Sequence, residues 1–377
     1  MTTLNPCGPS ALWGLLAFLP LALGAHAASA APRPFVSDGD KRLARQWLAS
    51  TMARGGALPF SFDYGGQPSS GFLPAWRRRH ATTRLDAQRT RDEYAFDDPR
   101  TGLTVRCVAV RYSDFPAVEW TVFFRNNGRA DTPLLSHIQA LDLRLSPAIP
   151  GDCTLHYSTG SHAGPDDYQP RTATLPLGAD LPLGGASGWS TTEVLSYFNL
   201  VGPDANVLVG LGWPGNWRAR FTRDAGGGLR ILAGQGLTHF VLHPGEEARS
   251  PLIALQFYTG DWIRGQNLWR RWMVAQNLPR AGGQPPPPIL ATAAPEIGGL
   301  HYNQANEIRA MDLAAQEKLP VNHWWIDAGW YPCHGNWYNV GTWREDRAEF
   351  PDGLRTVTDH ARRLGMRQVL WFEPERV

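Results

Sequence analysis

The sequence is poor in cysteine and nearly balanced in charge, and both facts exclude broad classes of protein. Four cysteines occur among 377 residues. Cys7 lies in an N-terminal segment that we expect to be removed, and the remaining Cys107, Cys153 and Cys333 can form one disulfide at most. The 36 basic and 34 acidic side chains leave a formal charge of +2, which is too little to neutralise nucleic-acid phosphates. Disulfides are therefore not the main source of stability, and we expect no nucleic-acid partner.

The sequence also lacks an apolar run that could span a bilayer. Its most apolar segment, residues 11–24, is shorter than the roughly 20 residues of a membrane-spanning helix, so we expect no membrane association. Small-residue triplets follow at 25–27 and 28–30, and either one fits a signal-peptidase site. We therefore expect residues 1–30 to be a signal peptide, the mature chain to begin near Ala28 or Ala31, and the protein to be exported to the periplasm or the medium.

Between residues 31 and 258 the sequence predicts one β-strand after another, divided by Gly, Pro, Asn and Asp. In the clearest strand, Val118, Trp120, Val122 and Phe124 alternate with more polar residues, and the turn signal Asn-Asn-Gly follows at 126–128. Further candidate strands are 103–112, 207–211, 229–233, 240–242 and 252–258. So many short strands predict a large β-sandwich.

Two features of composition have both a structural and a binding interpretation. The chain has 16 Trp and 10 Tyr; core packing explains most of them, although such rings also pack against the apolar faces of sugars. The run Arg-Arg-Arg-His at 77–80 is the only dense basic cluster of the sequence. We interpret it as a solvated loop, because no second basic run or helical stripe accompanies it.

The pattern changes after residue 258. Residues 262–278 place Leu268, Trp272 and Ala275 at helical spacing, which predicts an amphipathic helix that closes the sandwich. The stretch at 281–288 ends in four consecutive prolines, which lack the backbone donor that a helix or a sheet ladder needs. We therefore place a Pro/Gly linker at 281–288.

Residues 289–377 alternate between strands and helices. The pattern predicts strands at 289–293, 321–326 and 368–372, a helix at 306–316, and a second helix in which Leu354, Val357, Ala361 and Leu364 share one face before Gly365. This order is typical of a parallel α/β domain, whose ligands bind at the carboxyl ends of the strands. Functional residues are therefore expected just after residues 326 and 372.

A carboxylate and aromatic rings follow the second of these strands, in the segment Asp-Ala-Gly-Trp-Tyr-Pro at 327–332. Asp327 can accept hydrogen bonds from two sugar hydroxyls, and a ring packs against the C–H face of a pyranose. The alternative for Asp327 is a turn or N-cap carboxylate. Trp330 and Trp343 have the alternative of packing at the rim.

The segment at 325–330, Trp-Ile-Asp-Ala-Gly-Trp, resembles the Ile-Asp-Asp-Gly-Trp strand end of glycoside hydrolase family 36, the bacterial α-galactosidases. The similarity continues in the same order at 341–343, 350–354, 365–366 and 370–377, and residues 60–66 and 112–120 resemble the family's N-terminal domain. The resemblance implies an N-terminal β-supersandwich at 31–280 with its closing helix at 262–278. It also implies an incomplete TIM (β/α)8 barrel at 289–377.

The resemblance further implies a retaining hydrolase of terminal α-galactosidic linkages in oligosaccharides, without metal or cofactor. The family's nucleophile and general acid lie on later barrel strands, so we expect no catalytic residue in this chain and interpret the chain as the front part of the enzyme. Asp327, Trp330 and Trp343 would bind the α-galactoside. Family members often assemble as oligomers, which adds a homo-oligomer to the expectations.

Two departures from the family leave alternatives open. Ala328 and Thr342 stand where the family has acidic residues that hold galactose hydroxyls. A hydrolase of another α-linked sugar, such as N-acetylgalactosamine, is therefore one alternative. A non-catalytic carbohydrate-binding protein is the other.

Two further groups of residues could be mistaken for active sites. Glu373 and Glu375 resemble a catalytic pair, but side chains two residues apart in an extended segment share a face, and a substrate must lie between the two carboxyls. Cys333 and His334 have no second Cys/His pair nearby, so we expect no zinc site.

Overall fold

The computed structural model describes residues 36–52, 58–145, 151–185, 188–203, 205–294 and 300–373. The signal peptide expected at 1–30 and Glu375 lie outside these ranges. The chain divides between Asn277 and Leu278 into two compact units, a few residues before the proline-rich stretch at 281–288. Each unit is described by itself below.

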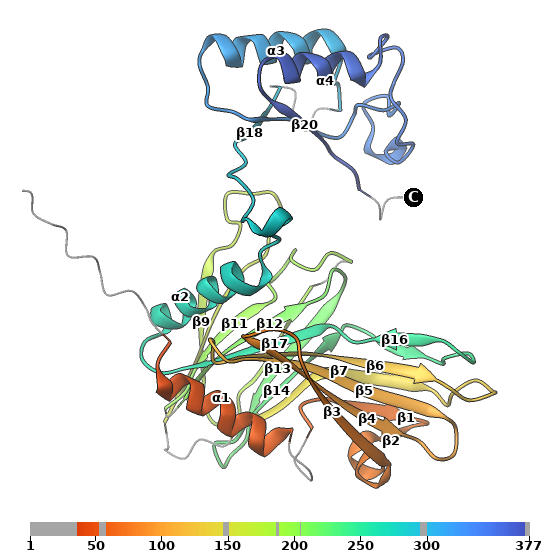
Figure 1. The fold of residues 1–377 in the computed structure, drawn as a ribbon, viewed down its shortest axis with the longest axis vertical. Helices are drawn as coiled ribbons and strands as arrows, with labels where there is room; N and C mark the ends of the chain where they lie inside the picture. The colour runs from red at the N-terminus through yellow and green to blue at the C-terminus, as the bar shows by residue number, and fades with distance from the viewer. Residues whose placement is uncertain are drawn as a thin grey trace, which may run out of the picture. The chain divides into compact units, whose positions relative to one another are not determined.

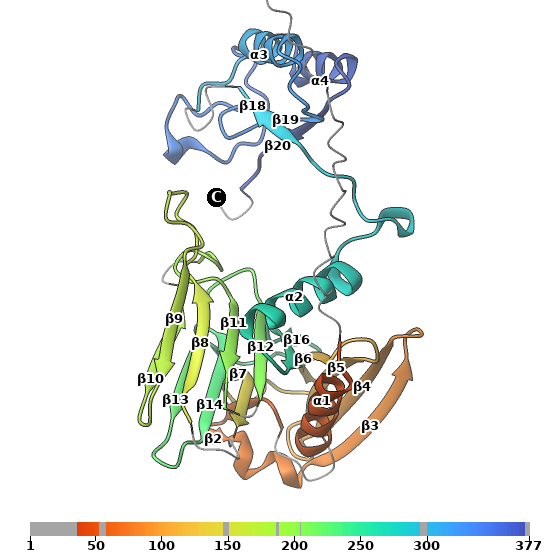
Figure 2. The same cartoon turned by 90° about the vertical axis from the view of Figure 1, so that its left-hand side faces the viewer.

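The N-terminal unit consists of two large antiparallel sheets (Figures 1 and 2). The larger sheet contains β3 (Arg77–Arg84), β4 (Arg89–Asp97), β5 (Leu103–Tyr112), β6 (Ala117–Asn126), β8 (Cys153–Ser158), β9 (Pro170–Leu175), β11 (Tyr197–Val201), β12 (Asn206–Gly212), β16 (Glu247–Arg249) and β17 (Leu252–Tyr258). The smaller sheet contains β1 (Ser61–Tyr64), β2 (Gln67–Pro68), β7 (Leu135–Leu145), β10 (Asp180–Gly184), β13 (Trp217–Arg223), β14 (Leu229–Gln235) and β15 (His239–Phe240). The strand order is β3-β4-β5-β6-β17-β12-β11-β8-β9 in the larger sheet and β10-β13-β14-β7-β1-β2 in the smaller one.

Alternating apolar residues hold the two sheets together. On β6 the side chains of Val118, Trp120, Val122 and Phe124 are completely buried, as the alternation in the sequence predicts. They join one core with residues of β7 and β14. The indole Nε1 of Trp120 also donates a hydrogen bond of 2.9 Å to the carbonyl oxygen of Ala140 on β7. A buried indole has its polar atom satisfied in this way.

Two helices cover this sandwich. Helix α1 (Asp38–Thr51) begins at a capping box in which Ser37 and Asp40 bond each other's backbone N–H groups, and Trp47 stacks on Trp120 with ring centroids 5.7 Å apart. Helix α2 (Trp262–Trp272) covers the outer face of the larger sheet, where Leu268 packs with residues of β12 and β17. It confirms the closing helix, although its last turn, Met273–Asn277, is π-helical.

The structure corrects two expectations for this unit. The run at 77–80 is not a loop but the start of β3, an edge strand that pairs with β4 only; its residues are mostly exposed, so no apolar alternation marks it. The region after residue 31 also does not consist of strands alone, because α1 precedes them. The described cysteines, Cys107, Cys153 and Cys333, are buried and form no disulfide.

The C-terminal unit has a short parallel sheet in the order β18-β19-β20. Its strands are β18 (Ala291–Ala293), β19 (His323–Ile326) and β20 (Arg367–Leu370), and its helices are α3 (Gln304–Gln316) and α4 (Leu354–Arg363). Figure 1 shows α3 and α4 side by side in this unit. Short 3-10 turns lie at Ala281–Gly283 and Trp337–Asn339 in this unit, and at Ser69–Gly71 and Leu73–Ala75 in the N-terminal unit. The order strand, helix, strand, helix, strand confirms the α/β pattern of the sequence.

Candidate functional site

The carboxyl ends of β19 and β20 bring together segments that are about forty residues apart in the sequence. Asp327 follows β19 directly, and Trp371, Phe372 and Glu373 follow β20. Because the two strands are parallel neighbours, both segments leave the sheet at the same edge. The indole Nε1 of Trp330 donates a 3.1 Å hydrogen bond to the carbonyl oxygen of Trp371, which ties the two segments to each other.

A glycine allows the chain to turn after Asp327. Gly329 has φ +109°, a value that favours glycine, and a Cβ built on it would lie 2.6 to 2.9 Å from backbone atoms of Leu300. Any larger residue would therefore push the backbone away from the segment around Leu300. The close approach fixes the direction in which Trp330 and Tyr331 leave the strand.

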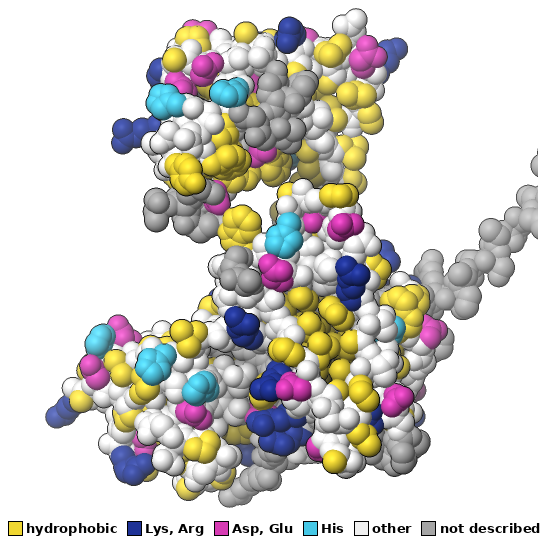
Figure 3. All heavy atoms as spheres, turned by 180° about the vertical axis from the view of Figure 1, so that it is seen from behind, with side chains coloured by type: hydrophobic (Ala, Val, Ile, Leu, Met, Phe, Trp, Pro, Cys, Tyr) yellow, Lys and Arg dark blue, Asp and Glu magenta, His cyan; other side chains and the backbone are white. Residues whose placement is uncertain are grey.

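Aromatic rings form a connected cluster at this edge of the sheet, which we call the strand-end cluster. Its ring contacts have centroid distances of 5.0 to 6.1 Å, the range of offset and edge-to-face pairs. Its members are Trp330, Tyr331, Trp337, Trp343, Trp371 and Phe372. In the space-filling view, hydrophobic side chains gather at one edge of this unit (Figure 3).

The members of the cluster differ in exposure. Trp330 is 3% exposed and Tyr331 is 1% exposed, so both support the cluster from beneath. Trp337 and Phe372 are 43% and 51% exposed, and Trp343 is half-buried. Of the two predicted tryptophans, Trp343 therefore keeps part of its ring exposed, whereas Trp330 is almost completely packed in the described structure.

Two carboxylates accompany the cluster. Asp327 is half-buried, and its Oδ1 accepts a 2.9 Å hydrogen bond from the backbone N–H of Ala328; this local bond is the turn contact that the sequence offered as the alternative, and it occupies one of its two oxygens. Glu373 is 8% exposed. Burial raises the pKa of the Tyr331 hydroxyl to about 12, and the negative charges of Glu373 and Asp327 add to this rise.

One carboxylate oxygen of Asp327 has no hydrogen-bond partner among the residues that the structure describes, and it lies beside partly exposed rings. Such an arrangement is suited to a polyhydroxylated ring rather than to an anion. The predicted residues Asp327, Trp330 and Trp343 all lie in this region. Sequence reasoning missed Trp337, Trp371 and Phe372. It placed residues 371 and 372 inside the predicted strand at 368–372, whereas β20 ends at Leu370, so both lie just beyond the strand end. Trp337 is far from any strand and carries no such signal.

Some other site classes find no candidate in the described ranges. Among these residues no three His, Cys, Asp or Glu side chains are grouped so that they could hold a metal ion. Within the same part of the chain, none of the helices has the length and apolar character needed to cross a membrane.

Comparison with known proteins gives consistent matches. The family model described as Melibiase matches residues 269–377. The chain is 24% identical over 200 residues to α-galactosidase Mel36A of Lactobacillus acidophilus, which covers 50% of this chain and 27% of that protein. It is 27% identical over 177 residues to an α-galactosidase of Escherichia coli, which covers 45% of this chain and 24% of that protein.

Solved structures extend the match in fold to most of the chain. The crystal structure of the GH36 α-galactosidase AgaA from Geobacillus stearothermophilus superposes with a TM-score of 0.65 at 17% identity, over 85% of this chain and 46% of that one. The galactosidase domain of the α-galactosidase–sucrose kinase AgaSK gives a TM-score of 0.64 at 17% identity, over 80% of this chain and 43% of that one. The chain thus spans about half the length of these solved relatives.

Proposed function

Because this chain is a relative of the family 36 α-galactosidases, we propose that the full-length protein hydrolyses terminal α-galactosidic linkages of oligosaccharides with retention of configuration. The curated relatives are named α-galactosidases, and variants of AgaA were crystallised with stachyose and with raffinose. In this proposal the two units are the family's N-terminal sandwich and the opening strands of its catalytic barrel.

The observation that carries the proposal is the position of Asp327 beside the strand-end cluster, at the carboxyl ends of parallel strands. Ligands bind at this end of the strands in α/β barrels. The free oxygen of Asp327 would accept hydrogen bonds from a pair of sugar hydroxyls, while Trp343 and Phe372 would pack against C–H groups of the ring. These residues would bind and orient the sugar.

The chemistry itself would use two further carboxylates. Retaining glycosidases place a nucleophile and a general acid about 5 to 5.5 Å apart. The family resemblance assigns both to strands that follow the segment at 371–375. Residues of this chain would therefore determine which sugar is held, and not which bond is broken.

The experiment that tests the proposal is the hydrolysis of an aryl α-galactoside by the full-length protein, followed by proton NMR. We expect release of the aryl alcohol with α-galactose as the first-formed sugar. β-Galactose as the first product would contradict the retaining mechanism, and no release from the α-galactoside would contradict the assigned reaction.

The two alternatives make different predictions. A non-catalytic sugar-binding protein would bind the α-galactoside without releasing alcohol in the same assay. A preference for N-acetylgalactosamine is suggested by the small side chain of Ala328, but Ala328 is completely buried in the core of its unit, so it opens no space toward a ligand there. Parallel rates on aryl α-galactoside and aryl α-N-acetylgalactosaminide would separate the two substrates.

Export remains part of the proposal. The N-terminal sequence of the protein recovered outside the cytoplasm should begin at Ala28 or Ala31 if the apolar segment is a cleaved signal. Recovery of the uncleaved chain from the cytoplasm alone would contradict export.

A further inference from the structure

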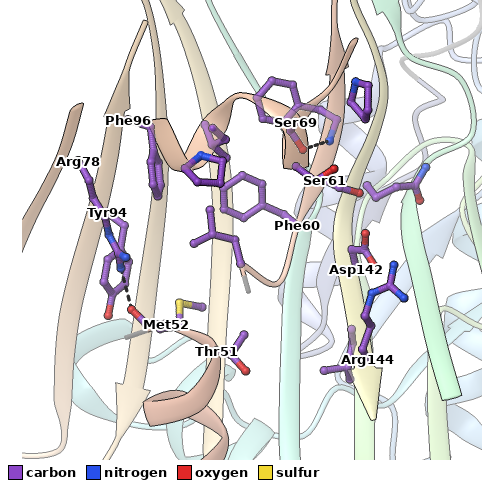
Figure 4. A pocket seen from close by; sticks show the side chains of 18 of the residues that line it. Thr51, Met52, Phe60, Ser61, Ser69, Arg78, Tyr94, Phe96, Asp142 and Arg144 are labelled. Atoms are coloured by element: carbon purple, nitrogen blue, oxygen red, sulfur yellow. Dashed lines mark hydrogen bonds between the residues drawn. The ribbon is translucent and has the colours of Figure 1, made fainter. Parts of the chain in front are cut away.

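The N-terminal unit contains a large groove that the proposed function does not use. It lies between the two sheets, with β3, β4 and β5 on one wall, β1, β7 and β14 on the other, and the last turn of α1 at one end. Its volume is about 1470 Å³, which exceeds the roughly 300 to 1000 Å³ of sites for drug-sized ligands. Figure 4 shows Arg78, Tyr94 and Phe96 on one side, Ser61, Asp142 and Arg144 on the other, and Phe60 between them.

The floor of the groove is apolar. The rings of Phe60 and Phe96 meet edge to face with centroids 6.5 Å apart, and Leu143 of β7 lies beside them in the lining. These side chains belong to the main core and are almost completely buried. Above this buried layer, Leu48 and Leu58 of the lining are partly exposed, so a ligand in the groove would meet apolar surface there and polar groups along the walls.

On the wall formed by β3, β4 and β5, both carboxylate oxygens of Asp92 accept hydrogen bonds from neighbouring side chains. Asp92 accepts hydrogen bonds from the hydroxyl of Thr82 at 2.6 Å and from Nε of Arg111 at 2.8 Å. Nε2 of His80 lies 3.2 Å from Oδ1 of Asp92. Burial alone would raise the pKa of Asp92, but the bonds from Thr82 and Arg111 outweigh it and lower the pKa. The terminal nitrogens of Arg111 have no hydrogen-bond partner among the described residues, and its side chain is 46% exposed.

The second wall repeats this arrangement. Asp142 accepts two hydrogen bonds from Arg230, at 2.8 and 2.7 Å, and its pKa is lowered because this guanidinium and the hydroxyl of Ser61 outweigh the effect of burial. Arg144 is exposed and lines the groove. Its guanidinium forms no hydrogen bond or ion pair with another described residue.

Among the described residues, the walls therefore have guanidinium N–H donors without a hydrogen-bond partner, whereas most of their carboxylate acceptors already have one. The lining contains four arginines and three aspartates, and the carboxylates of Asp92 and Asp142 are already bonded to arginines. Arg230 is bonded to Asp142 and Arg78 donates to the carbonyl oxygen of Met52, so Arg111 and Arg144 supply the donors that remain. Guanidinium N–H groups on both sides can donate hydrogen bonds to carboxylate oxygens, often as two parallel bonds. One small anion would fill only a small part of the volume and would leave the apolar floor uncovered.

We propose that this groove is a binding site for an acidic oligosaccharide, that is, several sugar rings that carry carboxylate groups. The carboxylates would contact the arginines of the two walls, and the C–H faces of the rings would cover the apolar floor. The site lies in the sandwich unit and is independent of the proposed hydrolysis, so either one can fail without the other.

The test is isothermal titration of the full-length protein with trigalacturonate at low salt, with the neutral maltotriose and with inorganic sulfate as comparison ligands. We expect trigalacturonate to bind at least about tenfold more tightly than either comparison ligand, because each charge-assisted hydrogen bond is stronger than a neutral one. We also expect the affinity to fall as salt is added. Equal binding of maltotriose would overturn the acidic specificity, equal binding of sulfate would reduce the groove to a small-anion site, and no binding would overturn the proposal.

Variants locate the binding. Arg144→Gln should weaken trigalacturonate binding about tenfold or more, since it removes a donor that has no hydrogen-bond partner among the described residues. Arg91→Gln is the matched control, because Arg91 is exposed on β4 and does not line the groove. Arg111→Lys keeps the positive charge but removes the planar guanidinium that can form two parallel hydrogen bonds. We therefore expect a loss of trigalacturonate affinity smaller than that of Arg144→Gln. Asp327→Asn should leave this binding unchanged; if it abolishes the binding and Arg144→Gln does not, the ligand occupies the strand ends instead.

Discussion

Replacing Gly329 by alanine should disrupt the turn that positions the candidate site. The residue has a φ of +109°, and a Cβ at this position would lie only 2.6 Å from the Cα of Leu300. A non-glycine residue in a sparsely populated backbone region costs of order 1 to 3 kcal/mol, and overpacking adds about 1 to 3 kcal/mol. We therefore expect Gly329→Ala to destabilise the C-terminal unit by about 3 kcal/mol or more.

The matched control for this change is Gly365→Ala. Gly365 follows α4 with φ +79°, but a Cβ there meets nothing within 4 Å, so only the left-handed backbone conformation is penalised, by about 1 to 2 kcal/mol. The local stability of the unit can be measured by hydrogen exchange of the β19 and β20 amides. Equal acceleration of exchange in the two variants would refute the role that we assign to the close approach at Leu300.

Two further predictions concern the sandwich. The Asp40 carboxylate is completely buried and ion-paired with Arg264 at 2.5 Å; burial alone would raise its pKa, but this pair and nearby hydrogen bonds outweigh burial and lower the pKa from its ordinary value. Its contribution to stability should therefore be present above about pH 4 and disappear as the pH falls through the folded pKa, and Asp40→Asn should flatten that part of a urea-unfolding series against pH. The side chain of Asn126 donates to the carbonyls of Ala130 and Leu242 and accepts from a backbone N–H, so Asn126→Ala should cost about 2 to 4 kcal/mol; a loss below about 0.5 kcal/mol by the same unfolding assay would contradict it.

Local patterns predicted the strands and helices where one physical signal dominates. The limits of β5 and β17 agree with the predicted strands because both are bounded by turn residues and filled with apolar side chains. The end of α4 agrees because Gly365 occupies the left-handed position after the helix. In each case the information lies within about ten residues of sequence.

The errors arise where local signals are absent or ambiguous. Strand β3 is exposed along nearly its whole length, so its arginines give no alternation, and pairing with β4 makes it a strand. Helix α1 was not predicted, although Ser37 and Asp40 form a capping box. This signal is present in the sequence, but the strand pattern that follows it dominates the region.

The candidate site was only partly predictable for the same reason. The rule for parallel strands predicted that the residues after the two strands share one edge of the sheet, and the parallel pairing of β19 and β20 places them there; their role in binding stays a prediction. The contact between Trp343 and Trp371 depends on the path of a long connection, for which the sequence has no periodic signal. The groove of the sandwich was also not foreseen, because its two walls come from strands that meet only in the folded unit.

The most direct test of the central claim is the effect of Asp327→Asn on kcat/KM of the full-length protein for raffinose. Asparagine can still accept the hydrogen bond from Ala328, so the change removes mainly the charge that would hold sugar hydroxyls. We expect a loss of about 10- to 150-fold, which corresponds to the roughly 1.5 to 3 kcal/mol of a hydrogen bond to a charged group. Asp359→Asn on the exposed side of α4 is the control and should leave the rate unchanged. Unchanged kcat/KM in Asp327→Asn would contradict the assignment of the strand ends as the sugar-binding site.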